Sequence, residues 1–250
     1  MVNFKLILEY NGARYSGWQE QTNARTVTGE LRKAAVEAFG CPVEIQGAGR
    51  TDAGVHALGQ VAHLRAASDP RRPAEVLKRR LNELLPSDIV ALHLEVAGRN
   101  FHARHDAVSR SYLYQISRRK QAFIKKYIWW IKDDLDLAAM SRAAAMLVGR
   151  HDFVCFRAAD SSKFEESTIV VVEKAQIEVD DDIIQFRIEA SHFLWRMVRR
   201  IVGVLVKVGT GEVSEREFSR LLEGKCDSKL DIAAWTAPAS GLFLEEVRYK

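Results

Sequence analysis

Residues 43–64, VEIQGAGRTDAGVHALGQVAHL, place a glycine-rich loop between two short β-strands. VEIQ at 43–46 and QVAHL at 60–64 are short, largely apolar runs, a pattern that favours strands. The segment between them, 47–59, holds four glycines, and glycine permits the sharp turns of a loop. We therefore predict a strand–loop–strand unit around this loop, which we call the glycine loop.

The elements on either side of this unit complete a recognisable order. FKLILEY at 4–10 alternates as a strand does, and 27–39 has helical spacing that stops at Gly40. After the unit, Pro73 opens a basic helix that ends near Pro86, and 88–96 is predicted to be a strand. The order β, α, β, β, α, β is that of the ferredoxin-like split βαβ motif.

The second half repeats this pattern in the order of its elements. Asp180-Asp181-Asp182 marks a hairpin turn between two long strands. We predict strands at 110–116, 167–179, 183–190 and 242–249, and helices at 135–149, 193–209 and 214–223. The fold predicted is α+β: two ferredoxin-like (RRM-like) subdomains, 1–104 and 105–250, which share a long mixed or antiparallel sheet with a cleft where they meet.

Composition excludes several classes of protein. The chain has 250 residues and is 47% hydrophobic with a net charge of only +4, so it is not disordered. It contains no apolar run long enough for a membrane helix, and its start does not have the pattern of a signal peptide. Cys41, Cys155 and Cys226 lie far apart, which argues against a disulfide framework or a cysteine-rich zinc site and suits a reducing cytosol.

The basic residues are segregated along the chain. The windows 65–80, 104–126 and 187–207 together carry a charge of +14, so the rest of the chain carries −10. Clustered Lys and Arg on a nearly neutral protein is typical of a surface that binds a phosphate backbone, although each window is equally compatible with a solvated face. In 193–209, Arg196, Arg199, Arg200 and Lys207 are predicted to share one helix face.

Asp52 is the only acidic residue of the glycine loop. The nearest carboxylates in the sequence are Glu44 and Asp69, so the loop is neither a local metal cage nor a local acid/base pair. It also lacks the sequence of a phosphate-binding P-loop or a dinucleotide turn. Its residues alone allow two interpretations: Asp52 is a nucleophile or base, or it caps a turn or pairs with Arg50.

Six segments in order resemble the tRNA pseudouridine synthase A family. They cover nearly the whole chain, which makes the resemblance specific. The segments are LEYNGARYSGWQ (8–19), GRTDAGVHA (49–57), FHAR with RSYLY (101–104 and 110–114), HDF with FR (151–153 and 156–157), FLWRMVRRIVG (193–203) and APASGL (237–242).

This resemblance implies an activity and a site. The family isomerises uridine to pseudouridine at positions 38–40 of the tRNA anticodon stem-loop, by breaking the N1–C1′ bond and rejoining the base through C5. The resemblance makes Asp52 the attacking aspartate and leaves open whether it attacks C1′ or C6 or a glycal forms. Tyr112 would pack against the target base, Arg199 would pair with the aspartate, and Arg50 would contact RNA.

The same resemblance implies an RNA-binding cleft, no metal or organic cofactor, a homodimer and a cytoplasmic location. Two alternatives remain open: a pseudouridine synthase with another RNA target, and an RNA-binding module without catalysis. A metal at His102 and His105 is disfavoured, because no Cys or carboxylate lies at metal-site spacing. For Phe123, Trp129 and Trp130, core packing or a dimer contact is favoured over stacking on bases.

Overall fold

The computed structural model describes residues 1–67, 69, 72–158 and 167–250. Arg71, which belongs to the first basic window, lies outside the described residues. The chain divides into two compact units: Met1–Val108 with Phe243–Lys250, and Ser109–Leu242. The last strand therefore belongs largely with the first unit. Among the described residues, no helix is long and apolar enough to cross a membrane.

The first unit has the ferredoxin-like order predicted from the sequence. Its strands are β1 (Val2–Tyr10), β2 (Val43–Gly47), β3 (His56–Ala66), β4 (Ile89–Val96) and most of β10 (Leu242–Tyr249). β1 lies between β4 and β3 and is antiparallel to both, and β2 pairs antiparallel with the end of β3. β10 runs parallel to the start of β3, where Phe243 lies opposite His56.

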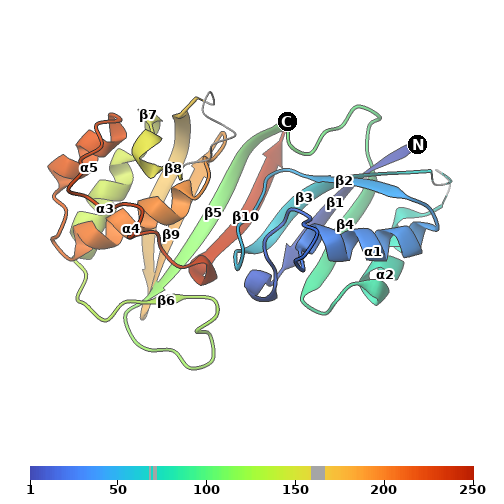
Figure 1. Cartoon of the computed structure of the whole chain (residues 1–250), viewed down its shortest axis with the longest axis horizontal. Helices are drawn as coiled ribbons and strands as arrows, with labels where there is room; N and C mark the ends of the chain where they lie inside the picture. Colours follow the sequence, from blue (N-terminus) through green and yellow to red (C-terminus); the bar gives the residue numbers. More distant parts are fainter. Residues whose placement is uncertain (68, 70–71, 159–166) are drawn as a thin grey trace. The chain divides into compact units, whose positions relative to one another are not determined.

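Two helices, which pack against each other, belong to this unit: α1 (Val27–Phe39) and α2 (Ala74–Leu84) (Figure 1). Thr26 caps α1 by accepting a hydrogen bond from the Gly29 N–H at 3.2 Å, and the helix ends at Gly40, whose φ of 71° suits glycine. Leu31 of α1 and Leu77 of α2 are fully buried, so each helix contributes its apolar face to the core.

The second unit contains β5 (Ala107–Ser117, from Ser109 on), β6 (Trp129–Trp130), β7 (Gly149–Asp152), β8 (Ile169–Asp180) and β9 (Ile183–Ala190). β5, β9, β8 and β7 follow one another as antiparallel neighbours, and β6 runs parallel to the end of β5. Asp181 has a φ of 50° in the two-residue turn between β8 and β9, which confirms the predicted hairpin. With helices beside the strands of each unit, the α+β class is confirmed.

The helices of the second unit are α3 (Leu137–Met146), α4 (Met197–Gly209) and α5 (Glu215–Leu222), which pack together (Figure 1). The start predicted for the longest helix is wrong: α4 begins at Met197, because Arg196 takes a left-handed backbone with a φ of 59°. Arg196 therefore does not belong to the helical basic face. Val154–Phe156 form a short 3-10 helix.

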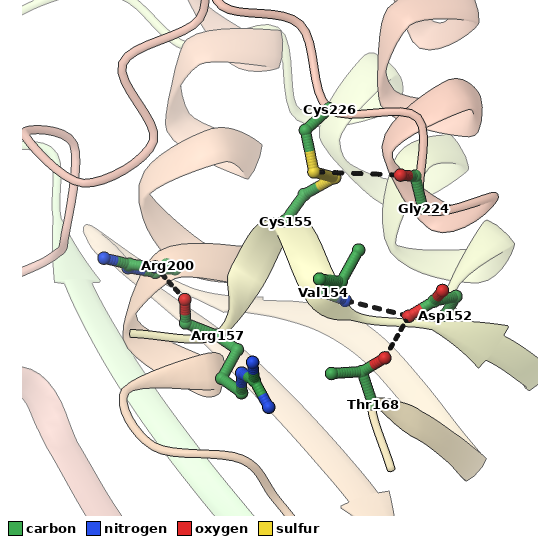
Figure 2. Close-up of a disulfide and its surroundings, with 8 residues drawn as sticks. All are labelled: Asp152, Val154, Cys155, Arg157, Thr168, Arg200, Gly224 and Cys226. Carbon is green, nitrogen blue, oxygen red and sulfur yellow. Dashed lines mark hydrogen bonds between the residues drawn. A yellow bond between two sulfur atoms is a disulfide. The ribbon is translucent and has the colours of Figure 1, made fainter. Parts of the chain in front are cut away.

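The expectation that the cysteines stay unpaired is wrong as well. Cys155 and Cys226 form a disulfide across 71 residues of the second unit (Figure 2). Cys41 is free. Asp152 lies beside them, where it accepts hydrogen bonds from Thr168 Oγ1 at 2.6 Å and the Val154 N–H at 3.1 Å. The spacing of the cysteines in the sequence did not predict this disulfide, because β7 and the segment after α5 become neighbours only in the folded structure. The cysteines thus give no argument for a reducing compartment.

Candidate active site

The glycine loop connects β2 to β3, and its backbone is fixed on both sides of Asp52. The Thr51 carbonyl accepts a hydrogen bond from the Trp18 N–H at 3.0 Å, and the Thr51 side chain is bonded to Tyr10 Oη at 2.8 Å. On the other side, the Val55 N–H donates to the Asp52 carbonyl at 3.1 Å. Asp52 therefore sits on a loop that secondary structure and buried side chains hold in one conformation.

The segment after β1 packs so closely on the loop that only glycine fits there. A Cβ on Gly12 would lie 1.9 Å from the Val55 carbonyl oxygen. A Cβ on Gly17, whose φ is 93°, would lie 2.7 Å from the Thr51 carbonyl oxygen. Residues 12–17 thus clamp the glycine loop on both sides of the aspartate.

Buried polar groups complete this support. Gln60 Nε2 donates to the Gly49 carbonyl at 3.0 Å, within reach of Tyr10 Oη at 3.5 Å. Burial raises the pKa of Tyr10 to about 12, so its hydroxyl stays neutral at physiological pH. Asp52 itself is partly buried, and Arg50 is exposed.

Tyr112 and Arg199 belong to the second unit, and each is fixed by local packing. Tyr112 lies on β5, opposite Ile188, with its ring 4.9 Å from that of Phe193 in an edge contact. Arg199, in the first turn of α4, donates from Nε to the Ala237 carbonyl at 2.7 Å, and the Ala237 N–H donates back to the Arg199 carbonyl at 3.1 Å.

Two further observations concern the surroundings of Arg199. A Cβ on Gly203 would lie 1.9 Å from the Trp235 carbonyl oxygen, so glycine lets the segment around Trp235 lie directly on α4. Burial raises the pKa of Tyr114 strongly, and the positive charge of Arg199 offsets part of this rise. The cation of Arg199 is therefore close enough to act on groups beside β5.

The structure thus groups the predicted residues in two pairs. Arg50 and Asp52 share the glycine loop of the first unit, and Tyr112 and Arg199 lie in the second unit. The sequence did not single out the residues that support the loop, namely Tyr10, Thr51, Gln60 and the two clamping glycines. One signal was available: the segment LEYNGARYSGWQ combines glycines with large aromatic residues, of which Tyr15 and Trp18 are both buried.

His102 and His105 belong to a row of three imidazoles rather than a metal cluster. The His63 and His102 rings lie 4.7 Å apart, and those of His102 and His105 lie 4.2 Å apart. Burial, together with the neighbouring His102 and Arg65 charges, lowers the pKa of His63 to about 4, and its Nδ1 accepts from the Ala103 N–H at 3.1 Å. Nowhere in the described parts of the chain do three His, Cys, Asp or Glu side chains form a group suited to a metal ion.

Comparison with known proteins gives a consistent result. A family model described as tRNA pseudouridine synthase matches residues 6–106 and 143–250. A tRNA pseudouridine synthase A of Thermoanaerobacter pseudethanolicus is 42% identical, and one of Acetivibrio thermocellus is 39% identical, each over 251 residues. A tRNA pseudouridine synthase A 2 of Bacillus anthracis is 37% identical over 252 residues. All three alignments cover 100% of both chains. The chain belongs to the tRNA pseudouridine synthase family, a family of isomerases.

Proposed function

We propose that this member of the family converts uridine to pseudouridine at positions 38–40 of the tRNA anticodon stem-loop, with Asp52 as the nucleophile. One observation carries the assignment: Asp52 is the only carboxylate of a loop that backbone hydrogen bonds and two close-packed glycines hold fixed. A nucleophile that attacks one atom of the substrate must be held at a fixed position, and a rigid loop provides this.

The reaction is an isomerisation, so its atoms balance within the substrate. The Asp52 carboxylate forms a covalent bond to the ribose at C1′ or to the uracil at C6, and the N1–C1′ bond breaks. The uracil turns over, and a C5–C1′ bond forms. If the carboxylate is bonded to C1′, it leaves as this bond forms, and if it is bonded to C6, it leaves afterwards. C5 then loses its proton to solvent, and N1 gains one. This sequence needs neither an oxidant nor a metal, and we propose that the enzyme uses no cofactor.

We assign the other three residues to binding and orientation. Tyr112 packs against the target base, where its edge contact with Phe193 fixes the ring. Arg199 pairs with the attacking carboxylate and orients it, and Arg50 contacts the RNA. A uridine in a paired stem must first be flipped out, at a cost of a few kcal/mol, which contacts between basic residues and phosphates can offset.

The assembly and location follow from the same proposal. We expect a homodimer that binds tRNA in the cytoplasm, where tRNA is processed. A disulfide is rarely maintained in that compartment, so Cys155 and Cys226 would there be present as neighbouring thiols for much of the time.

Tritium release from tRNA labelled at uracil C5 tests the proposal. We expect wild-type protein to release tritium and Asp52→Asn to be slower by about 10³-fold or more. Glu44→Gln, which removes an exposed carboxylate from the neighbouring strand β2, is the matched control and should keep wild-type activity. Equal rates for Asp52→Asn and wild type would refute the assignment.

A second set of substrates separates the alternatives. If the targets are positions 38–40, a transcript with its single anticodon stem-loop uridine at position 38, 39 or 40 should react. A transcript with that uridine at another position should not react. Release from unrelated RNAs at the same rate would favour a different RNA target. Tight tRNA binding without release by the wild type would favour an RNA-binding module.

A further inference from the structure

Residues 118–132, RRKQAFIKKYIWWIK, form a basic segment that the proposed chemistry does not use. The segment carries six Lys or Arg residues, four aromatic residues and no acid. It leaves the end of β5 as a long loop and returns to pair with that strand through β6 (Figure 1). The family model matches residues 6–106 and 143–250, so the basic segment lies outside the matched residues.

Both ends of the segment are anchored to the second unit. At one end, the Arg118 N–H donates to the Asp182 carbonyl at 2.9 Å, and Arg119 Nε donates to the Asp182 carboxylate at 2.5 Å. At the other end Ile128 is buried, and the Tyr127 carbonyl accepts from Gln115 Nε2 at 3.2 Å. The loop between these anchors is therefore held at a defined place beside β5 and β9.

The middle of the segment is turned to solvent. Phe123 is 98% exposed, so the core packing favoured from its sequence does not occur. Lys120 and Lys125 are exposed as well, and the Lys120 ammonium lies 5.8 Å from the centre of the Trp130 ring, which is 43% exposed. Trp129 differs, because its ring packs against Tyr114. The surface thus combines lysines with an accessible aromatic ring.

We propose that the basic segment is a second RNA-binding surface, which holds the substrate tRNA through backbone phosphates at Lys120 and Lys125 and an unpaired base stacked on Phe123. This inference rests on the proposed function for its substrate. Lysines interleaved with exposed aromatic rings match the chemistry of an RNA strand, which offers phosphates and base faces together. Self-association of two such segments would bring like charges together, which disfavours a second copy of the chain as the partner.

The test measures tRNA affinity and turnover in the full-length protein. Lys120→Gln/Lys125→Gln should raise the KM and Kd for tRNA about five- to tenfold and lower the slope of log Kd against log salt by about 1 to 2, with kcat unchanged. Lys33→Gln/Lys229→Gln removes two exposed lysines elsewhere and should leave affinity unchanged. Phe123→Leu should weaken binding about fivefold or more, and Phe123→Tyr should restore it, because only an aromatic ring stacks on a base.

The outcomes separate this inference from the proposed function. Wild-type Kd and salt slope in both Lys120→Gln/Lys125→Gln and Phe123→Leu would overturn the basic segment as an RNA-binding surface, whatever the turnover. A change in the number of chains per particle on sedimentation, seen in these variants and not in Lys33→Gln/Lys229→Gln, would overturn it in favour of a contact between copies. Absence of tritium release by the wild type would instead contradict the proposed function, while the Kd measurements would still decide this inference.

Discussion

The glycine loop and the basic segment are both irregular connections, but they are built in opposite ways. Around Asp52, Thr51 and Val55 are buried and hydrogen-bonded, and Gly12 leaves no room for even one carbon atom. Around Phe123, the chain is anchored at its two ends, and residues 122–126 are exposed. A group that attacks one atom must be fixed to fractions of an ångström, whereas phosphates can be held by long, adaptable side chains. The structure of each loop therefore fits the task proposed for it.

The largest expected effect on stability lies outside both loops. Removing the disulfide in Cys155→Ser/Cys226→Ser should lower the free energy of unfolding by about 2–4 kcal/mol, because the bond closes a loop of 71 residues. Denaturant unfolding with and without reductant measures this difference. Cys41→Ser, which alters the free cysteine, is the control and should unfold as the wild type does. A double variant as stable as the wild type would mean that the disulfide adds nothing to the fold.

The next effect tests how rigidly the glycine loop is held. Gly12→Ala places a Cβ against the Val55 carbonyl and should cost about 1–3 kcal/mol of stability and lower kcat. Gly49→Ala is the matched control for stability, since nothing lies within 4 Å of its Cβ. Thermal unfolding of the two variants measures the difference in stability between them. If Gly12→Ala is as stable as Gly49→Ala, the glycine loop can shift to accommodate the added carbon. The difference in rigidity between the glycine loop and the basic segment would then be lost.

A smaller expected effect is a dependence of the stability of the fold on pH. His63 has a folded pKa of about 4, below its unfolded value near 6.5, so the unfolded chain takes up this proton first as the pH falls. Stability should therefore decrease between pH 6.5 and 4, by about 1–2 kcal/mol after allowance for solvent screening. His63→Gln should reduce this dependence. Equal pH profiles for His63→Gln and wild type would exclude His63 as the cause.

The smallest effect sharpens the account of the basic segment. Asp182→Asn removes the carboxylate that pairs with Arg119 and should change stability by less than about 1 kcal/mol, because the pair is exposed. It should also strengthen tRNA binding about twofold, since a nearby negative charge is lost. Filter binding at two salt concentrations measures this change. Weaker binding would show that anchoring the segment matters more than its charge.

Most elements were predictable from local sequence patterns. The strands β1 and β9 alternate clearly, and the run of aspartates at 180–182 marked the hairpin between β8 and β9 correctly. Local patterns failed where the backbone departs from its usual conformation. The apolar spacing of 193–209 continues past the true helix start, because nothing in that spacing reveals the left-handed backbone at Arg196.

Contacts between distant segments set the other limit. The disulfide, the clamp of residues 12–17 on the glycine loop, and the exposure of Phe123 depend on which segments the fold brings together. For the site, the motif around Asp52 identified the loop but not the residues that hold it. The roles of Arg50, Asp52, Tyr112 and Arg199 remain predictions that only chemistry on the substrate can test.

One measurement tests the central claim, that chemistry depends on the glycine loop and tRNA affinity on the basic segment. It is the single-turnover rate of tritium release at saturating tRNA, compared among wild type, Asp52→Asn and Lys120→Gln/Lys125→Gln. We expect Asp52→Asn to stay about 10³-fold or more below wild type at any tRNA concentration, and the lysine variant to reach the wild-type rate at saturation. A wild-type rate for Asp52→Asn at saturation would contradict the account.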